Sequence, residues 1–268
     1  MKSFSIEEAY LWAQRFFARE WRLLLPVAFA FIAFPPLLFD FLVPASASAT
    51  LSAAVQTNNA VLALSVIRWL LPLMLIFYLL GSIGGLTITA LALAPGISVQ
   101  EALLLALRRL AVLVGSQLLL IAAAMAVAIL LGMSRLAPLG VQAFLFGLVI
   151  GLSIFVGVRL VLLMPMIVHR HIGPISAIRE SWIMTAGTFW RLFATIIFYL
   201  LGAFIVMLAL SSAVGSVLLL LGKAIGASEL GVALNAVFVR ALVAVATLGL
   251  NLLGVGIFRQ LDGAIKGS

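Results

Sequence analysis

The sequence contains no cysteine and only two histidines among its 268 residues. Without cysteine the chain forms no disulfide, carries no thiolate nucleophile and offers no thiolate ligand to a metal. Charged residues make up 9% of the chain, against a usual share of about 25%. Hydrophobic residues account for 65% of it. This composition is typical of a protein whose surroundings are mainly lipid.

Residue patterns that carry catalysis are also scarce. His169 and His171 flank Arg170, but a His-x-His pair without a third ligand is a poor metal site, and Glu180 is the only acid close to it. The glycine-rich stretch at 81–85 precedes no Lys-Ser or Lys-Thr, so it lacks the phosphate-binding P-loop pattern. We therefore expect a non-enzymatic protein that uses no metal and no cofactor.

Long apolar runs dominate the rest of the chain. Six of them are predicted to span a membrane, at about 23–43, 61–94, 110–132, 139–168, 192–221 and 231–258. A helix needs about 20 apolar residues to cross the hydrocarbon core, and continuous runs favour helices over barrel strands, which alternate apolar and polar residues. The second run is longer than one crossing needs and contains Gly81, Gly84 and Gly85, so it is tilted, broken there or extended past the membrane. Gly81 with Gly85, and Gly147 with Gly151, predict close helix packing.

Basic residues are divided unevenly between two sets of polar segments. One set holds Lys2, Arg15, Arg19, Arg22, Arg108, Arg109, Arg170, Arg179, Arg191, Arg259 and Lys266, and the other holds Arg68, Arg135, Lys223 and Arg240. Because short cytoplasmic loops are enriched in Lys and Arg, this bias predicts that both termini face the cytoplasm. The net charge of +8 suits anionic lipid head groups. The charges form no single patch, so nucleic acid is not an expected partner.

Three amphipathic segments are predicted on the cytoplasmic side, at 4–17, 97–110 and 173–193. Ser5 with Glu8, and Ser98 with Glu101, match the capping box, in which a hydroxyl and a carboxylate satisfy free amides at a helix start. In the first segment, aromatic residues occupy one helix face, and Arg15, Arg19 and Arg22 occupy another. Each segment is expected to be an elbow between hairpins or a surface for lipid or a partner.

The predicted fold follows from these patterns. We expect an all-α polytopic membrane protein with six transmembrane helices in three pseudo-repeated hairpins, each preceded by a cytoplasmic interfacial amphipathic helix. Residues 1–268 form a single integral membrane domain with pseudo-repeats at about 4–94, 97–168 and 175–262.

Arg159 is the one charge placed deep inside an apolar run, with Pro165 after it. An arginine at the centre of a membrane helix costs roughly 2.5–3.5 kcal/mol on insertion scales, so it normally faces protein or water. One interpretation is contact with an anion or a lipid head group inside the bundle. The other is snorkelling, or the capping of carbonyls freed by a proline kink. Asp40, near the outer end of the first run, is placed to pair with an outer arginine such as Arg68 or Arg240.

The stretch around 155–195 carries a family resemblance. The residues concerned are Arg159, Pro165, Gly173, Pro174, Ala177, Ser181, Trp182, Thr185, Gly187, Phe189, Trp190 and Arg191. They resemble the central signature of the membrane domain of some glycerophosphoryl diester phosphodiesterases and of related stand-alone bacterial inner-membrane proteins of unknown function. The chain departs from that signature in two places: Glu180 separates Arg179 from Ser181, and Arg170 stands where an acid is expected.

The resemblance implies a six-span membrane domain in a bacterial inner (plasma) membrane. It does not imply hydrolysis, because the phosphodiester chemistry of those enzymes belongs to a separate soluble barrel. We expect a non-enzymatic integral membrane protein that supports envelope or lipid homeostasis, by binding anionic lipid, a partner protein or a second copy. The candidate contacts are Arg159, Arg15, Arg19, Arg22, Arg179 and Arg191. The alternative is a small transporter or permease component with a site near Arg159; a membrane-embedded lipid enzyme is disfavoured because acids and histidines are few.

Overall fold

The computed structural model describes residues 5–57, 59–133, 138–170 and 172–266, and all regular structure in these ranges is helical. The elements, in chain order, are α1 (Ile6–Ala28), η1 (Phe29–Ala33), α2 (Phe34–Leu42), α3 (Ala45–Gln56), α4 (Ala60–Leu93), α5 (Val99–Met133), α6 (Leu139–Arg159), α7 (Leu163–His169), α8 (Pro174–Met184), α9 (Phe189–Ala224) and α10 (Ser228–Lys266). The predicted all-α class is confirmed.

Six helical stretches of the described chain are long and apolar enough to cross a membrane, as predicted. They are Ile6–Leu42, Val61–Leu93, Val99–Ile129, Leu139–His169, Phe189–Ala224 and Ser228–Gly263. A stretch of about 20 apolar residues suffices for one crossing, and each of these stretches exceeds it. The chain is therefore a multi-pass membrane protein.

The first two amphipathic segments are not separate from the spans that follow them. α1 and α5 each run without a break from the polar start into the apolar run. At the start of α5, Ser98 Oγ accepts from Glu101 N at 3.2 Å and Glu101 Oε2 accepts from Ser98 N at 2.8 Å, so the predicted capping box is complete. At α1, Ser5 Oγ accepts from Glu8 N, but Ser5 N donates to Gln260 Oε1 at 3.1 Å. That bond ties the start of α1 to α10.

Only the third amphipathic segment forms a helix of its own. α8 begins at Pro174, and a turn separates its end from the start of α9. In this turn Gly187 has φ +80°, a left-handed conformation that favours glycine. In the other two segments, no proline or glycine stands where the amphipathic part meets the apolar run that follows it, so the helix continues from one into the other.

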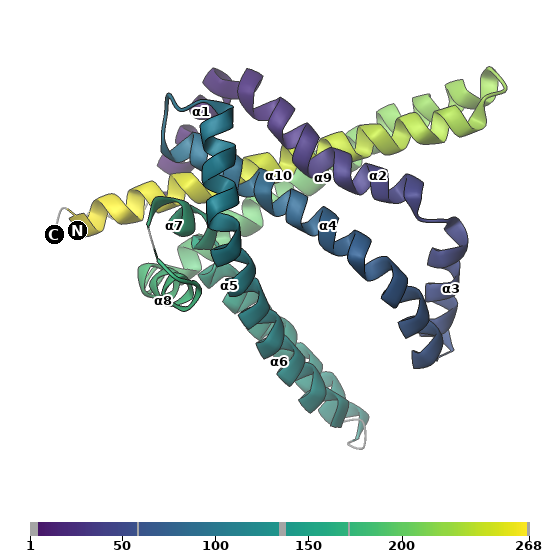
Figure 1. Ribbon diagram of the computed structural model, residues 1–268, viewed down its shortest axis with the longest axis horizontal. Coiled ribbons are helices and arrows are strands. Elements are labelled where there is room, and N and C mark those ends of the chain that lie inside the picture. The colour runs from purple at the N-terminus through teal and green to yellow at the C-terminus, as the bar shows by residue number, and fades with distance from the viewer. Residues whose placement is uncertain (1–4, 58, 134–137, 171, 267–268) are drawn as a thin grey trace.

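The first span contains a π-helical turn, η1, between α1 and α2. Pro35 and Pro36 follow this turn directly. Proline has no N–H to donate and its ring clashes with the carbonyl four residues earlier, so the regular hydrogen-bond ladder cannot continue through this point. The span accordingly changes direction between α1 and α2 (Figure 1).

The core lies where the C-terminal third of α4 meets η1, α7 and α10. α4 is unbroken through its glycines and is buried continuously over residues 82–92. A Cβ on Gly84 would lie directly against the Cβ of Phe31, and one on Gly85 would lie 3.3 Å from the sulfur of Met164. The close packing is therefore made by Gly84 and Gly85. The pair Gly147 and Gly151, expected to pack closely, faces open space instead.

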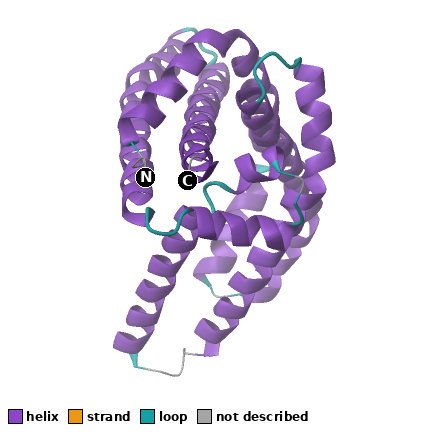
Figure 2. Cartoon of the chain, turned by 90° about the vertical axis from the view of Figure 1, so that its left-hand side faces the viewer, coloured by secondary structure: helices purple, strands orange, loops and turns teal. Residues whose placement is uncertain are grey.

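α10 is the central helix of the molecule. Half of its most apolar stretch is buried, whereas the corresponding share is 11% in the spans of α4, α5, α6–α7 and α9. From this centre, the α5–α6 hairpin and the α9–α10 hairpin diverge as two arms (Figure 1). Figure 2 shows the same arms from the side on which the helices gather. The faces between the arms are apolar and exposed.

An ion pair joins the C-terminal end of α2 to α10. Arg240 Nε and Nη2 both donate to Asp40, at 2.6–2.8 Å, although the two residues lie 200 positions apart. The bidentate geometry orients both side chains as well as neutralising both charges. Of the two arginines proposed as partners of Asp40, Arg240 is the one it meets.

Candidate functional site

Arg159 fixes the end of α6 to α8. Its Nη1 donates to the carbonyl oxygen of Trp182 at 3.1 Å and to Thr185 Oγ1 at 3.4 Å. Its own carbonyl oxygen accepts from Ser181 Oγ at 2.7 Å. The guanidinium carbon lies 5.3 Å from the ring centroid of Phe155 and 5.2 Å from that of Trp182. A cation between two aromatic rings is stabilised by both of them.

These contacts show which carbonyls Arg159 serves. The oxygen of Trp182 belongs to the last turn of α8, where carbonyls lack donors from their own helix. The predicted capping of carbonyls freed by Pro165 is therefore wrong in its target, since the guanidinium reaches α8 instead.

The remaining signature residues shape the connections around α8. Pro165 is buried in α7, and Gly173 and Pro174 begin α8. Phe189 packs on Phe155 with ring centroids 4.8 Å apart. Trp190, in contrast, is 76% exposed. The signature thus sets the path of the chain from α6 to α9.

Arg170, which sequence reasoning did not assign a partner, links three helices. Its Nη1 lies 2.6 Å from Glu180 Oε2 in α8, and its Nη2 lies 2.9 Å from Asp262 Oδ1 in α10. The hydrogen bonds that the guanidinium donates to Asp262 and Glu180 raise the pKa of Arg170 above its usual value. His169 Nε2 stands 3.9 Å from the second oxygen of Asp262. Glu180 could be identified from the sequence as an acid near Arg170. Asp262 lies 92 positions away, and nothing in the sequence indicates that it is a partner.

The other predicted arginines lie on separate exposed surfaces. Arg15, Arg19, Arg22, Arg179 and Arg191 are all exposed. Arg19 pairs with Glu20 at 2.9 Å, and Arg22 lies over the ring of Trp21. Arg15 borders a pocket between α1 and α10 that Arg259 and Gln260 also line. Arg179 borders a second pocket, with Trp182. Lys2, Arg135 and His171 lie outside the described residues.

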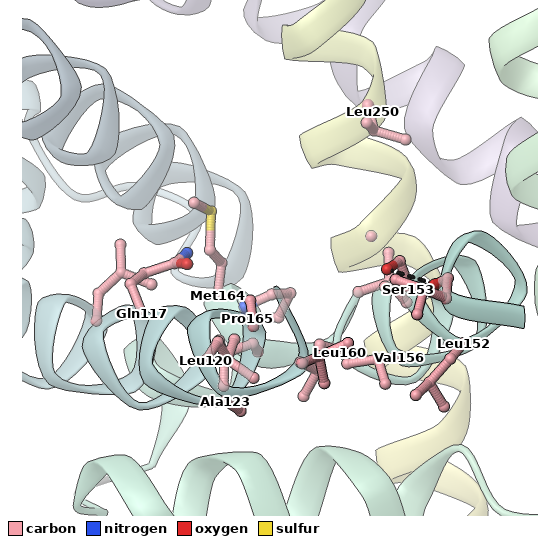
Figure 3. A pocket seen from close by; sticks show the side chains of 18 of the residues that line it. Gln117, Leu120, Ala123, Leu152, Ser153, Val156, Leu160, Met164, Pro165 and Leu250 are labelled. Atoms are coloured by element: carbon pink, nitrogen blue, oxygen red, sulfur yellow. Dashed lines mark hydrogen bonds between the residues drawn. The ribbon is translucent and has the colours of Figure 1, made fainter. Parts of the chain in front are cut away.

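A groove of about 610 Å³ lies between α5 and α6, with α4, α7 and α10 at one end. Its lining is almost entirely aliphatic (Figure 3). The polar residues that line it are Thr89, Gln117, Ser153 and Asn251. The hydroxyls of Thr89 and Ser153 donate to backbone carbonyls of their own helices. Sequence reasoning missed this groove; the available signal was two single amides, Gln117 and Asn251, inside apolar runs.

Residues 134–262 match the family model of the membrane domain of glycerophosphoryl diester phosphodiesterase. The resemblance is therefore confirmed, and it extends beyond 155–195 to include most of α6 and α10. No curated protein and no solved structure shows significant similarity to the chain.

Proposed function

We propose that this chain, in which residues 134–262 match that membrane domain, is a non-enzymatic bacterial inner-membrane protein that supports envelope or lipid homeostasis by binding anionic lipid at its cytoplasmic face. The observation that carries the proposal is a set of exposed arginines that pair with no acid among the described residues. Those in the basic-rich polar segments are Arg15, Arg22, Arg108, Arg179, Arg191 and Arg259. Guanidinium groups bind phosphate through paired N–H donors.

The acids near the helix junctions support a non-enzymatic role. Glu180 and Asp262 both receive hydrogen bonds from Arg170, and Glu101 caps α5. A carboxylate held in this way is committed to structure rather than to proton transfer. The transporter alternative stays a prediction without a specific contact in its favour, because Arg159 is engaged by α8 and does not line the groove.

The proposal includes an orientation: both termini and α8 lie on the cytoplasmic side, and three hairpins carry the spans. Because the chain has no cysteine, single cysteines report this topology without background. We expect Lys223→Cys, exposed in the last turn of α9, to react with a membrane-impermeant maleimide in spheroplasts, and Ser176→Cys, exposed on α8, to react only after the membrane is opened. The reverse pattern would exclude the orientation.

The lipid proposal is tested by neutralising inner arginines. Arg15 and Arg22 are the suitable pair on α1, because Arg19 is already held by Glu20. Each lysine or arginine near an anionic surface contributes about 1 kcal/mol of attraction. We therefore expect Arg15→Gln/Arg22→Gln to reduce the phosphatidylglycerol and cardiolipin that co-purify in mild detergent by about tenfold or more, as counted by native mass spectrometry.

The matched control removes two charges from the opposite set, as Arg68→Gln/Lys223→Gln. It should retain anionic lipid at the wild-type level. Equal losses from both double variants would mean that net charge alone governs retention, and the proposed cytoplasmic lipid surface would be abandoned.

A further inference from the structure

The groove between α5 and α6 combines an aliphatic wall with unpartnered amides. No charged residue lines it. The side chains of Gln117 and Asn251 make no hydrogen bond within the described part of the chain, whereas the lining hydroxyls are satisfied. Water is excluded from the hydrocarbon core, so an amide left without a partner there is costly. The groove is thus suited to an apolar ligand that brings an uncharged hydrogen-bonding group.

The two amides stand at the end of the groove where α4, α7 and α10 contribute to its lining. Asn251 belongs to α10, and its Nδ2 lies 3.9 Å from the position of a Cβ on Gly85 of α4. The Gln117 side chain extends from α5 toward Met164 of α7 (Figure 3). The rest of the lining comes from α5 and α6, which contribute mostly alanine, valine and leucine.

The groove is long enough to hold a lipid chain. Along α5 the lining runs from Leu113 to Leu131, which is about 27 Å at 1.5 Å per residue. The hydrocarbon core is about 30 Å thick, so one leaflet supplies acyl chains of roughly 15 Å depth. A whole acyl chain therefore fits along the groove, with its polar end at the amides.

We propose that this groove binds one acyl chain of a membrane glycerolipid, and that Gln117 and Asn251 donate hydrogen bonds to the ester carbonyl of that chain. The inference deepens the proposed lipid-binding function and rests on it. The site selects the uncharged linkage of the lipid, whereas the inner arginines select its head group. A soluble ionic substrate has no counter-charge here.

Photo-crosslinking tests occupancy. The protein is reconstituted in phosphatidylethanolamine–phosphatidylglycerol vesicles that contain a trace of phosphatidylglycerol with a diazirine in one acyl chain. Peptides covering 113–131 and 149–164 should carry most of the label. Ala124→Phe places a ring in the groove and should reduce that label at least fivefold, whereas Ala122→Phe, on the opposite face of α5, should not. Equal labelling of the two variants would overturn the site.

A second pair of probes tests the amides. An ester-linked probe should label the groove several-fold more than an ether-linked probe of the same chain length, because only the ester offers a carbonyl acceptor. Gln117→Leu/Asn251→Leu should abolish this preference, and Gln100→Leu, in the exposed first turn of α5, should keep it. No preference in the wild type would exclude the amide contact.

The lipid-retention and labelling experiments together separate the groove from the proposed function. If the protein retains anionic lipid but its groove is not labelled, the groove proposal alone is overturned. If both lipid retention and groove labelling are absent, the proposed function is overturned as well.

Discussion

Replacing Arg170 with methionine is expected to lower the free energy of unfolding in detergent by about 2 kcal/mol, between the small cost for an exposed ion pair and the larger cost of removing one partner from a buried pair, because the Arg170 side chain is 33% exposed and that of Asp262 is 10% exposed. The reason is that Asp262 is only 7% exposed and would lose its 2.9 Å contact with the guanidinium, while His169 Nε2 stays 3.9 Å from its other carboxylate oxygen. The ionic link between α7, α8 and α10 would be lost together with it. Urea titration in micelles, followed by circular dichroism, measures the change.

Two further variants separate charge from side-chain size. Arg179→Met, exposed on α8 and beside Glu180 in sequence, should change stability by less than about 0.5 kcal/mol. Arg170→Lys should give an intermediate loss, because a single ammonium does not reproduce a fork that reaches two carboxylates. If Arg170→Met and Arg179→Met cost the same, the three-helix ion pair contributes nothing specific.

Gly84→Val is expected to prevent normal packing of the core and to cost about 3 kcal/mol or more, at the upper end of the range for overpacking. The new Cβ would fall on the Cβ of Phe31, which is fixed to the backbone of η1 and cannot rotate away. α4 would have to move away from the first span along its buried stretch. Thermal unfolding in detergent and the fraction of monodisperse protein after purification report the effect.

Gly147→Val is the matched control for this substitution. Gly147 is also inside a membrane helix, but a Cβ there meets no atom within 4 Å. It should purify and unfold like the wild type. A similar loss from both variants would mean that valine itself, rather than the contact with Phe31, disturbs the helix.

Hydropathy was sufficient to predict the number and the approximate places of the spans, because crossing the membrane is a local property of about 20 residues. The pairing of Asp40 was predicted as a choice between two arginines, and geometry selected Arg240. The partners of Arg170 could not be predicted in full. Nothing in a single sequence indicates that Asp262 returns to α7 after two further spans.

The periodicity of the amphipathic segments predicts that they are helical, but not whether each is a helix separate from the span that follows it. Polar and apolar faces at helical spacing predicted three helices, and all three segments are helical. Whether such a segment is a separate element depends on a break in the backbone. Pro174 and Gly187 supply one on either side of α8, and α1 and α5 contain none at that point. The helix α3, in the connection after the first span, was not predicted because its sequence is rich in alanine and serine and has little amphipathic pattern.

The groove was beyond sequence reasoning for a different reason. Its walls consist mainly of leucine, alanine and valine. The same residues line a pair of helices that packs closely and a pair that leaves a groove, so the sequence does not distinguish the two. Its volume depends on how α5 and α6 lie relative to each other, which is a property of the tertiary structure and not of either helix alone. Gln117 and Asn251 become informative only when both are placed in the same space.

The lengths of α9 and α10 have a consequence for the bilayer itself. At 36 and 39 residues they measure about 54 and 58 Å, against a hydrocarbon thickness of about 30 Å. Their shared tip is apolar, with Leu221, Ile225 and Leu230 exposed, so it cannot extend far into water without cost. This arm must lie obliquely in the lipid, and a thicker membrane is accommodated by a steeper arm and a thinner one by a flatter arm.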